Sequence, residues 1–386
     1  MHPAHKVERP NRDRGAVVTY AAADRAHRHD AVTQAAIAAR LAALKGYRFA
    51  GEYDPADRPS GRVYFVPGAT MVGVAAANAL GVRTEDDLFG GVVPHPFVAT
   101  KAITHPLVEP GAAAPEGWSH GFARRVRSVV LPGFTAFTLL DARKAGLRLL
   151  QHGPVRLKQP RSGGGRDQVV VTAPGELEAA LDHLDPGDLS QHGLVLERNL
   201  DDVTTYSVGQ VRLGGLTVTY CGTQRATPDN AGATVYGGSD LLVVRGDYGD
   251  LLGLGPAPAF RLAIARARAY DAATEEFAGF FASRRNYDVI RGRDAHGRWR
   301  CGVLESSWRL GGASGPEVAA LEAFRGDDAL TAVRAWCVES YGPDLEPPPR
   351  AVVHYHGVDE RLGPLIKYTL TEPYVPPRGA RRNPRR

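Results

Sequence analysis

The stretch GVLESSWRLGGAS, residues 302–314, decides the fold of this chain. It begins with the apolar residues of a buried strand and then continues with an acid, two serines, a tryptophan, an arginine and paired glycines. Charged side chains rarely enter a core without a partner, so this strand end predicts a binding site. Side chains alternate along a strand, and the spacing therefore places Glu305 and Ser307 on one face, with Arg309 two residues further.

A second predicted strand, NYDVI at residues 286–290, is joined to this stretch by the turn DAHG. Antiparallel pairing would bring Asp288 next to Glu305, and two carboxylates so close repel each other unless a cation lies between them. Mg²⁺ binds one or two carboxylates together with phosphate oxygens, so the pair predicts a magnesium site to which Ser307 adds a third oxygen. The alternative is a pair of surface carboxylates on an exposed sheet face.

Arg309 would lie beside a phosphate or a substrate carboxylate, because its planar fork binds two oxygens at once. A salt bridge to Glu305 alone is the alternative for this residue. Arg225, on the predicted strand that ends in GTQRAT, is the candidate for a second anchor of phosphate or carboxylate.

A possible phosphate site lies in PVRLKQPRSGGGRD, residues 154–167. Lys158 ends a predicted strand, and the turn that follows contains Ser162, Gly163, Gly164 and Gly165. Glycines allow backbone N–H groups to converge on an anion, and a lysine adds a point charge. The alternative is a hairpin turn with a lysine that reaches solvent.

The pattern D…E-x-S-x-R-x-G-G resembles the metal and phosphate strand pair of the ATP-grasp superfamily. The similarity covers roughly residues 95–330 and implies ATP and Mg²⁺ as cofactors. It implies that Lys101 is the first nucleotide lysine, that Lys158 and the glycine loop form the second lysine with its phosphate cover, and that LVLERNL is the adenine hinge. The hinge residues that the resemblance assigns to the base are Glu197 and Leu200.

Two positions depart from the family pattern. Members usually carry asparagine where Ser307 stands and glutamate where Thr205 stands, and a hydroxyl is a weaker metal ligand than an amide oxygen. Asp202 is the candidate that would contact the ribose in place of the missing glutamate. Catalysis is therefore less well supported than nucleotide binding, and a nucleotide-binding regulator without turnover is the alternative function.

A chain of 386 residues exceeds the usual size of one core, so two or three subdomains are expected. GAVVTY and GRVYFVPG read as strands, and Asp30 is expected to cap the helix that follows GAVVTY; no GxGxxG follows either strand. Helices are expected at 71–82, at 95–105, and at the end of the chain. The predicted fold is α/β and α+β: an ATP-grasp fold behind an N-terminal Rossmann-like domain. The predicted parts are 1–14 (disordered), 15–125 (N-terminal domain and linker), 126–200 (lid), 201–375 (large subdomain) and 376–386 (basic disordered tail).

The net charge of +5 is located in the last nine residues, RGARRNPRR, which hold five arginines and no acid, so the rest of the chain is neutral (5 − 5 = 0). Nucleic acid is therefore an unlikely partner. The polar N-terminus lacks the apolar core of a signal peptide and the three cysteines give no disulfide framework, which favours the cytoplasm. The sequence indicates no membrane span, and it does not indicate an oligomeric state.

Two further motifs suggest other chemistry. GWSHG at 117–121 fits the serine-hydrolase pattern G-x-S-x-G with Ser119 as nucleophile, but EPGAAAPE precedes it where an apolar strand is needed. His354 and His356 share a strand face, without a third metal ligand nearby. The favoured function is an ATP-dependent ligase that activates a small-molecule carboxylate as an acyl-phosphate for attack by an amine or similar nucleophile, releasing ADP and phosphate.

Overall fold

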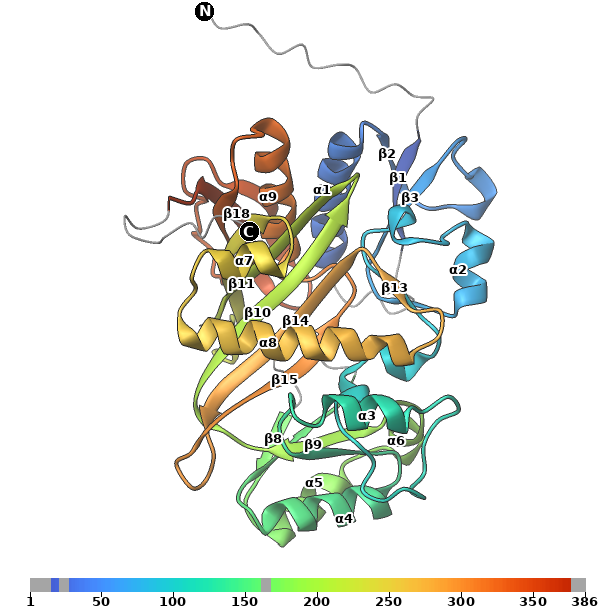
Figure 1. Ribbon diagram of the computed structural model, residues 1–386, viewed down its shortest axis with the longest axis vertical. Coiled ribbons are helices and arrows are strands. Elements are labelled where there is room, and N and C mark those ends of the chain that lie inside the picture. The colour runs from blue at the N-terminus through green and yellow to red at the C-terminus, as the bar shows by residue number, and fades with distance from the viewer. Residues whose placement is uncertain (1–14, 21–27, 161–167, 376–386) are drawn as a thin grey trace, which may run out of the picture.

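The structure is a computed structural model, which describes residues 15–20, 28–160 and 168–375 (Figure 1). The strands among these residues form four sheets. None of the described helices is both long and apolar enough to span a bilayer. The predicted mixed α/β architecture is confirmed, and the large sheet and the smaller lid sheet lie at different levels of the molecule in Figure 1.

The N-terminal layer is a parallel sheet of order β2-β1-β3. Val17 of the central strand packs with Ile37 and Leu41 of the helix that covers it, so the apolar faces of sheet and helix form one core. Asp30 lies in the first turn of that helix and not before it, so the prediction that it caps the helix was wrong. The bounds are β1 Ala16–Tyr20, α1 Arg28–Lys45, β2 Arg48–Glu52, η1 Pro55–Asp57 and β3 Val63–Pro67.

A small sheet of order β13-β5-β4 joins this layer to the rest of the chain. The helix predicted at 71–82 begins later than expected, because Met71–Val72 pairs as a strand with β5. The bounds are β4 Met71–Val72, α2 Val74–Leu80, η2 Glu85–Asp87, β5 Gly91–Val93 and β13 Phe281–Ala282.

The part of the chain predicted to be the lid, which keeps that name below, contains an antiparallel sheet of order β6-β9-β7-β8. Its helices pack on the sheet through Ala145, Leu149 and Leu177, and they form the lowest part of the molecule in Figure 1. The bounds are β6 Gly133–Ala136, α4 Leu139–Leu150, β7 Val155–Lys158, β8 Gln168–Val171, α5 Pro174–Asp182, α6 Pro186–His192 and β9 Leu194–Arg198.

The large sheet has eight antiparallel strands in the order β15-β14-β10-β11-β12-β16-β18-β17. The sequence predicted helices at the end of this region, and that prediction was wrong for the end of the chain, since three strands follow α9. The bounds are β10 Asp201–Leu213, β11 Leu216–Pro228, β12 Thr234–Arg245, α7 Tyr248–Gly253, α8 Pro258–Ala273, η5 Thr274–Glu276, β14 Arg284–Arg293, β15 Trp299–Ser307, α9 Ser314–Gly326, β16 Ala332–Tyr341, β17 Val352–Asp359 and β18 Gly363–Pro373.

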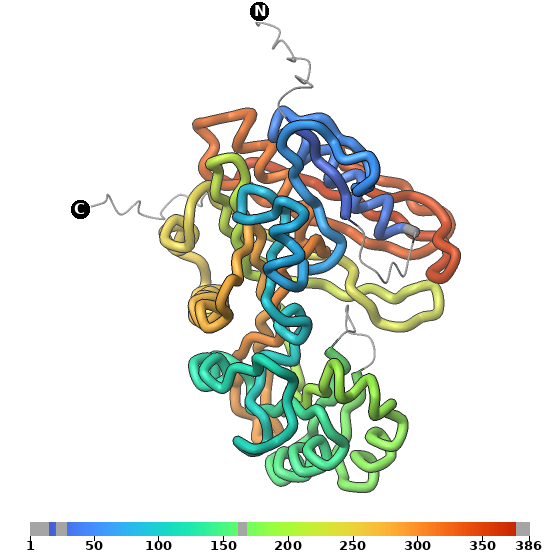
Figure 2. Tube along the Cα trace, turned by 90° about the vertical axis from the view of Figure 1, so that its right-hand side faces the viewer, coloured from blue at the N-terminus to red at the C-terminus, as the bar shows by residue number. Residues whose placement is uncertain are grey.

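The two faces of the large sheet are covered by different helices. Tyr206, Tyr287 and Val289 pack in one core with residues of α8, which crosses the sheet in Figure 1. Tyr220 and Leu241 point to the opposite face and pack with α9 and α1. Figure 2 shows the lid below the large sheet. The polar site lies on the second of these faces.

The segment at 95–105 is not the single helix that the sequence predicts. It forms two short 3₁₀ turns, η3 Pro96–Ala99 and η4 Lys101–Thr104, and α3 His120–Val126 follows later. Thr135 of the lid donates a hydrogen bond from its hydroxyl to the carbonyl of Ala102 at 2.7 Å, and Thr104 donates to the carbonyl of Leu304 at 3.3 Å. The segment is therefore bonded on one side to the lid and on the other to β15.

Candidate functional site

Asp288 and Glu305 face each other directly in the register of β14 and β15. The next pair along is Val289 with Val303, so Leu304 is an extra residue that forms a β-bulge. Without the bulge, alternation would place Glu305 on the face of Val303, which is buried in the α8 core. The bulge turns Glu305 to the face of Asp288 and thus brings the two carboxylates together.

The environment of Asp288 disfavours its charge. Burial and the neighbouring carboxylate of Glu305 raise the pKa of Asp288 to about 7. Gln224 of β11 donates a hydrogen bond from Nε2 to Asp288 Oδ1 at 2.7 Å, which holds the carboxyl group in place but adds no positive charge. The side chain is thus oriented and incompletely neutralised.

Lys101 supplies the positive charge nearest to Glu305. Its Nζ lies 2.9 Å from Glu305 Oε2, and the lysine side chain is only 7% exposed whereas the glutamate is 31% exposed. A buried ammonium group is stable only beside an anion, so Glu305 has a charge partner that Asp288 lacks at this distance. Lys101 also lowers the pKa of Asp288, but burial and Glu305 outweigh it.

A second buried cluster joins the lid to the same segment. Glu197, which is 2% exposed, forms an ion pair with Lys158 and lies 3.1 Å from the Nε2 atom of His105. Burial alone would raise the pKa of Glu197, but the charge of Lys158 and the contact with His105 reverse the shift and hold the pKa at about 2. Lys158 therefore faces an ionised carboxylate.

The two clusters are connected through the chain itself. Lys101 begins η4 and His105 follows its last residue, so one short segment carries the partner of Glu305 and the partner of Glu197. Both lysines predicted for the nucleotide thus lie on elements that this segment holds together: Lys101 faces the large sheet and Lys158 lies at the end of lid strand β7.

Ser307 lies on the face of the two carboxylates, directly opposite Asn286. Its hydroxyl accepts a hydrogen bond from Arg284 Nη1 at 3.3 Å, and the same guanidinium binds the carbonyl of Arg309. Arg284 is fully buried and forms an ion pair with Glu317 of α9 at 2.8 Å. This pair fixes the end of β15, and it places a positive charge beside the oxygen predicted to bind metal.

Asn286 is a site residue that the sequence interpretation missed. Its amide Nδ2 donates to the hydroxyl groups of Ser207 at 2.7 Å and Tyr220 at 3.0 Å. Both amide hydrogens are thus used, which sets the orientation of the amide and leaves its oxygen as an acceptor on the face of Asp288. Its position two residues before Asp288 on a strand was the available signal.

Other predicted residues lie apart from this cluster. Arg225 follows Gln224 on β11 and points to the opposite face of the sheet, where its Nη2 donates to the carbonyl of Cys337 at 2.8 Å. Asp202 is exposed, has a φ of 50° and lies 3.7 Å from Arg293. Leu200 is buried at 6% exposure, and Arg309 is exposed at the end of β15. The predicted residues Ser162, Gly163, Gly164 and Gly165 lie outside the described residues.

The donor set suits magnesium only if a ligand such as a nucleotide completes it. Among the described residues no group of three or more His, Cys, Asp or Glu side chains could hold a metal ion. Two carboxylates and an amide or hydroxyl oxygen leave several positions for phosphate oxygens and water, and Mg²⁺ commonly binds in this way. The insufficiently neutralised Asp288 fits a site that receives a divalent cation together with an anionic ligand.

The residues of the competing motifs have other partners. Ser119 precedes α3, and its hydroxyl accepts a hydrogen bond from the backbone N–H of Phe122 at 3.0 Å, as a helix cap does. His354 is buried and bonded to Thr369 at 2.8 Å, and burial lowers its pKa to about 4. His356 is exposed on the same strand.

Solved structures with a similar fold cover nearly the whole chain. An N5-carboxyaminoimidazole synthase from Aspergillus clavatus, in complex with ADP and 5-aminoimidazole ribonucleotide, has a TM-score of 0.50 and 11% identity over 94% of this chain and 95% of that chain. The N5-carboxyaminoimidazole synthetase of Staphylococcus aureus, complexed with ADP, has a TM-score of 0.47 and 13% identity over 94% and 95%. The biotin carboxylase of Campylobacter jejuni has a TM-score of 0.49 and 11% identity over 93% and 87%.

The likeness to the Aspergillus enzyme shows that the chain has the ATP-grasp fold, as its motifs predicted. No curated protein matches the sequence. The sequence profile of one family, described as "Protein of unknown function (DUF3182)", matches residues 17–369, and the chain belongs to this family.

Proposed function

We propose that this protein is an ATP-dependent ligase that activates a small-molecule carboxylate and joins it to an amine or a similar nucleophile. The observation that carries the proposal is the direct pairing of Asp288 with Glu305 beside the buried Lys101. A core face that gathers two carboxylates and a lysine is costly unless it binds a ligand. ATP-grasp neighbours that bind ADP support the same kind of reaction.

The nucleotide would bind between the lid and the large sheet. Lys158 and Lys101 are suited to its phosphates, because each is a compact charge whose present partner is a carboxylate that it can exchange for a phosphate. Glu197 and Leu200, at the junction of β9 and β10, would contact the adenine. The glycine loop with Ser162 and the ribose contact of Asp202 remain predictions from the sequence.

Asp288 and Glu305 would hold Mg²⁺, with Ser307 or Asn286 as the third protein oxygen. The ion would neutralise charge on the phosphates as phosphoryl transfer proceeds. Lys101 would have to leave Glu305 and turn toward the phosphates when the ion arrives, since both cations cannot share one carboxylate oxygen at close range.

The chain's residues would act by placement, with no covalent attachment to the protein. The substrate carboxylate oxygen attacks the γ-phosphorus and ADP leaves, which gives an acyl-phosphate. The nucleophile then attacks the acyl carbon, loses a proton and displaces phosphate. Arg309, which follows β15 by two residues, would hold the substrate carboxylate or the transferred phosphoryl group.

A nucleotide-binding regulator without turnover is the second candidate function. The contact of Arg284 with Ser307 favours it, because a guanidinium beside the third ligand opposes metal binding there. Serine hydrolysis by Ser119 is a remote third candidate, and its capping role counts against it.

One experiment separates these functions. The purified protein is incubated with Mg-ATP and a metabolite mixture, phosphate release is recorded, and the product is identified by mass spectrometry. Phosphate and ADP formed only with a carboxylate present support the ligase. Calorimetric binding of Mg-ATP without turnover supports the regulator, and AMP with pyrophosphate would indicate a different transfer. Failure to bind Mg-ATP would refute both nucleotide functions.

A further inference from the structure

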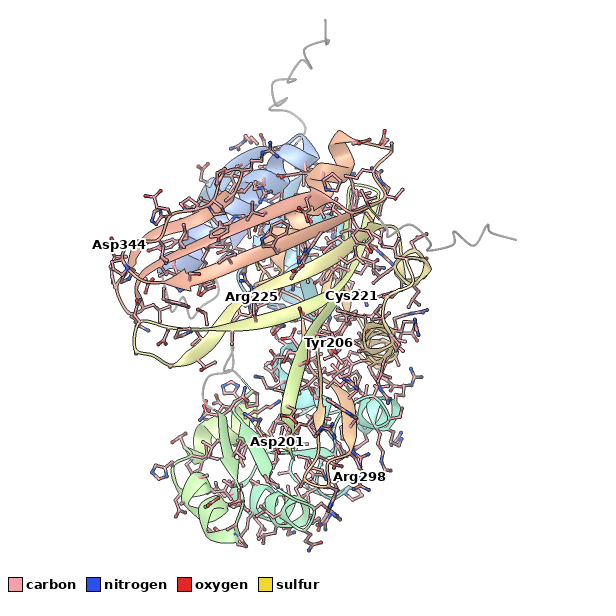
Figure 3. All side chains as sticks on the ribbon, turned by 90° about the vertical axis from the view of Figure 1, so that its left-hand side faces the viewer. Asp201, Tyr206, Cys221, Arg225, Arg298 and Asp344 are labelled. Carbon is pink, nitrogen blue, oxygen red and sulfur yellow. The ribbon has the colours of Figure 1, made fainter. Side chains whose placement is uncertain are left out.

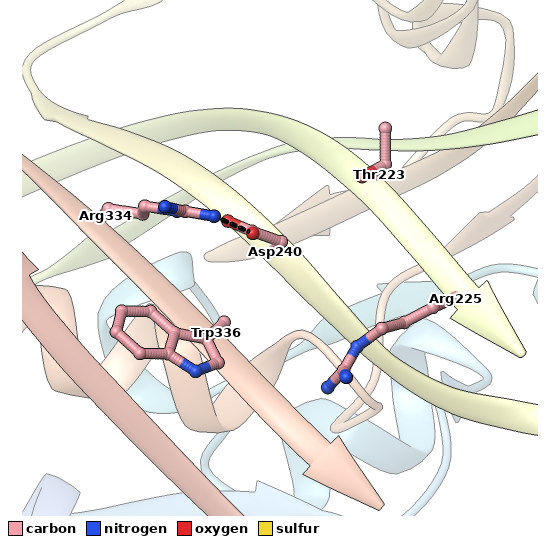
Figure 4. A pocket seen from close by; sticks show the side chains of 5 residues that line it. All are labelled: Thr223, Arg225, Asp240, Arg334 and Trp336. Carbon is pink, nitrogen blue, oxygen red and sulfur yellow. Dashed lines mark hydrogen bonds and ion pairs between the residues drawn. The ribbon is translucent and has the colours of Figure 1, made fainter. Parts of the chain in front are cut away.

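A cavity of about 430 Å³ opens on the other face of the large sheet, away from Asp288. It is lined by side chains of three adjacent strands, β11, β12 and β16 (Figure 4). Thr223 pairs with Asp240, and Asp240 pairs with Trp336, so these three residues form one row across the sheet. The full lining is Thr223, Arg225, Asp240, Arg334 and Trp336.

The alternation of β11 separates this cavity from the proposed nucleotide site. Gln224 donates to Asp288 on one face, and its neighbours Thr223 and Arg225 point to the other. In Figure 3 Arg225 lies on the large sheet, above the lid. A ligand in the cavity would therefore not occupy the place proposed for ATP.

The charges in the cavity do not cancel. Arg334 forms a two-fold contact with Asp240, at 2.9 Å from Nε and 2.5 Å from Nη2, which neutralises both groups. Arg225 donates to the carbonyl of Cys337 at 2.8 Å, and it has no carboxylate partner among the described residues. One positive charge therefore remains uncompensated at the cavity.

Gly238 makes room for this arrangement. It pairs with Arg225 across β11 and β12 and has a φ of +137°, which residues with a side chain rarely adopt. A Cβ atom here would lie 2.9 Å from Arg225 Nη2 and 2.2 Å from the Cys337 carbonyl oxygen. The missing side chain leaves room for Arg225 to cross β12 and donate to the Cys337 carbonyl of β16.

Trp336 adds a flat surface and a second donor. Its side chain is half-buried, and Arg334 lies 5.7 Å from the ring centroid. Figure 4 shows the nitrogen-bearing edge of the indole facing the guanidinium of Arg225 across the cavity. Among the described residues the indole N–H has no hydrogen-bond partner, so two donors converge on one space and neither is satisfied by a carboxylate of the chain.

We propose that this cavity binds a small aromatic carboxylate. The carboxylate would accept hydrogen bonds from Arg225 and from the indole N–H of Trp336, and the ring of the ligand would pack on the indole. A volume of about 430 Å³ suits a ligand of this size. The site does not depend on the proposed ligase activity, because no residue of the nucleotide site lines it.

The test uses protein labelled with 5-fluorotryptophan, in which the ¹⁹F resonance of Trp336 is identified by its absence from Trp336→Phe. Benzoate is titrated as the probe, with cyclohexanecarboxylate and benzyl alcohol as partners that lack the flat ring or the charge. We expect saturable shifts of the Trp336 resonance with benzoate, and affinities at least 5-fold weaker for the other two.

Arg225→Gln should weaken benzoate binding at least 10-fold, whereas Arg143→Gln, which removes an exposed arginine from the lid, should leave it unchanged. Asp288→Asn should also leave it unchanged, which separates this site from the nucleotide site. The proposal is overturned if benzoate does not shift Trp336, if Arg225→Gln binds it as the wild type does, or if the three probes bind equally.

Discussion

Glu305 lies directly across from Asp288 only because Leu304 forms a bulge in β15. The bulge carbonyl is held by the hydroxyl of Thr104, on the same short segment that brings Lys101 to Glu305. One local irregularity therefore sets both the pairing of the acids and the position of their nearest lysine. The site depends on the register of two strands as much as on the identity of its residues.

The acidic pair predicts the effect of Mg-ATP on stability. We expect Mg-ATP to raise the Tm of the wild type and to have little effect on Asp288→Asn or Glu305→Gln, because a ligand stabilises the fold only to the extent that it binds. Scanning fluorimetry with and without Mg-ATP measures this, alongside phosphate release. Glu178→Gln, on the exposed surface of the lid, is the control that should behave as the wild type. A full Mg-ATP shift in both site variants would remove the metal assignment.

The raised pKa of Asp288 predicts a dependence of stability on pH without magnesium. The carboxyl titrates near 4 when unfolded and at about 7 when folded, so the folded state keeps a proton that the unfolded state has lost. The free energy of unfolding should therefore fall as pH rises from about 4 to about 7, relative to Asp288→Asn. Comparison with this variant subtracts the opposing titration of His354.

Urea unfolding at several pH values measures this difference. A difference between wild type and Asp288→Asn that stays constant over the range would show that folding does not raise the pKa of Asp288.

The Lys158–Glu197 ion pair predicts a strong energetic coupling in the lid. Lys158→Met leaves Glu197 buried without its cation and should cost about 3–5 kcal/mol, as loss of one partner of a buried pair does. The double variant with Glu197→Gln should cost clearly less than the sum of the single changes. Urea unfolding of the four proteins gives the coupling energy, and additive effects would contradict the pair.

The same lysine variant tests nucleotide binding. Lys158→Met should weaken ATP binding in calorimetry, since a phosphate would lose a charge partner. An unchanged dissociation constant in a variant that remains folded would rule out a role of this lysine at the phosphates.

Proximity in the sequence determined how much of the site could be predicted. Asp288 and Glu305 were predicted to lie together because a short turn joins their strands and antiparallel pairing brings the two strands side by side. The bulge at Leu304 was not visible, since simple alternation places Glu305 with Val303. The prediction of the pair was thus reached without the feature that produces it.

Contacts between segments that are distant in the sequence could not be predicted from the spacing of residues within each segment. His105, Lys158 and Glu197 come from three separate elements, and their sequence neighbours do not indicate that they meet. Residues 95–105 contain apolar side chains at helical spacing, yet two 3₁₀ turns form because the segment is bonded to the lid on one side and to β15 on the other. The partners of such a segment are set by tertiary packing.

The buried pair of Arg284 and Glu317 gives the last prediction. Arg284 joins α9 to the carbonyls of Ser307 and Arg309, so it acts as a positioning residue for the end of β15. Arg284→Met should destabilise the fold by about 3–5 kcal/mol, because Glu317 is fully buried and would lose its cation. Glu317→Gln still offers Tyr220 an acceptor, so adding it should restore part of this loss.

The double variant distinguishes the role of Arg284 in positioning the end of β15 from its role in stabilising the fold. If Arg284 orders the end of β15, the partly restored protein will still bind Mg-ATP more weakly than the wild type, because nothing replaces the contacts to Ser307 and Arg309. Calorimetry at a temperature where both proteins are folded measures this. Wild-type affinity in the double variant would show that Arg284 serves stability alone, and that packing of α9 is enough to place the strand end.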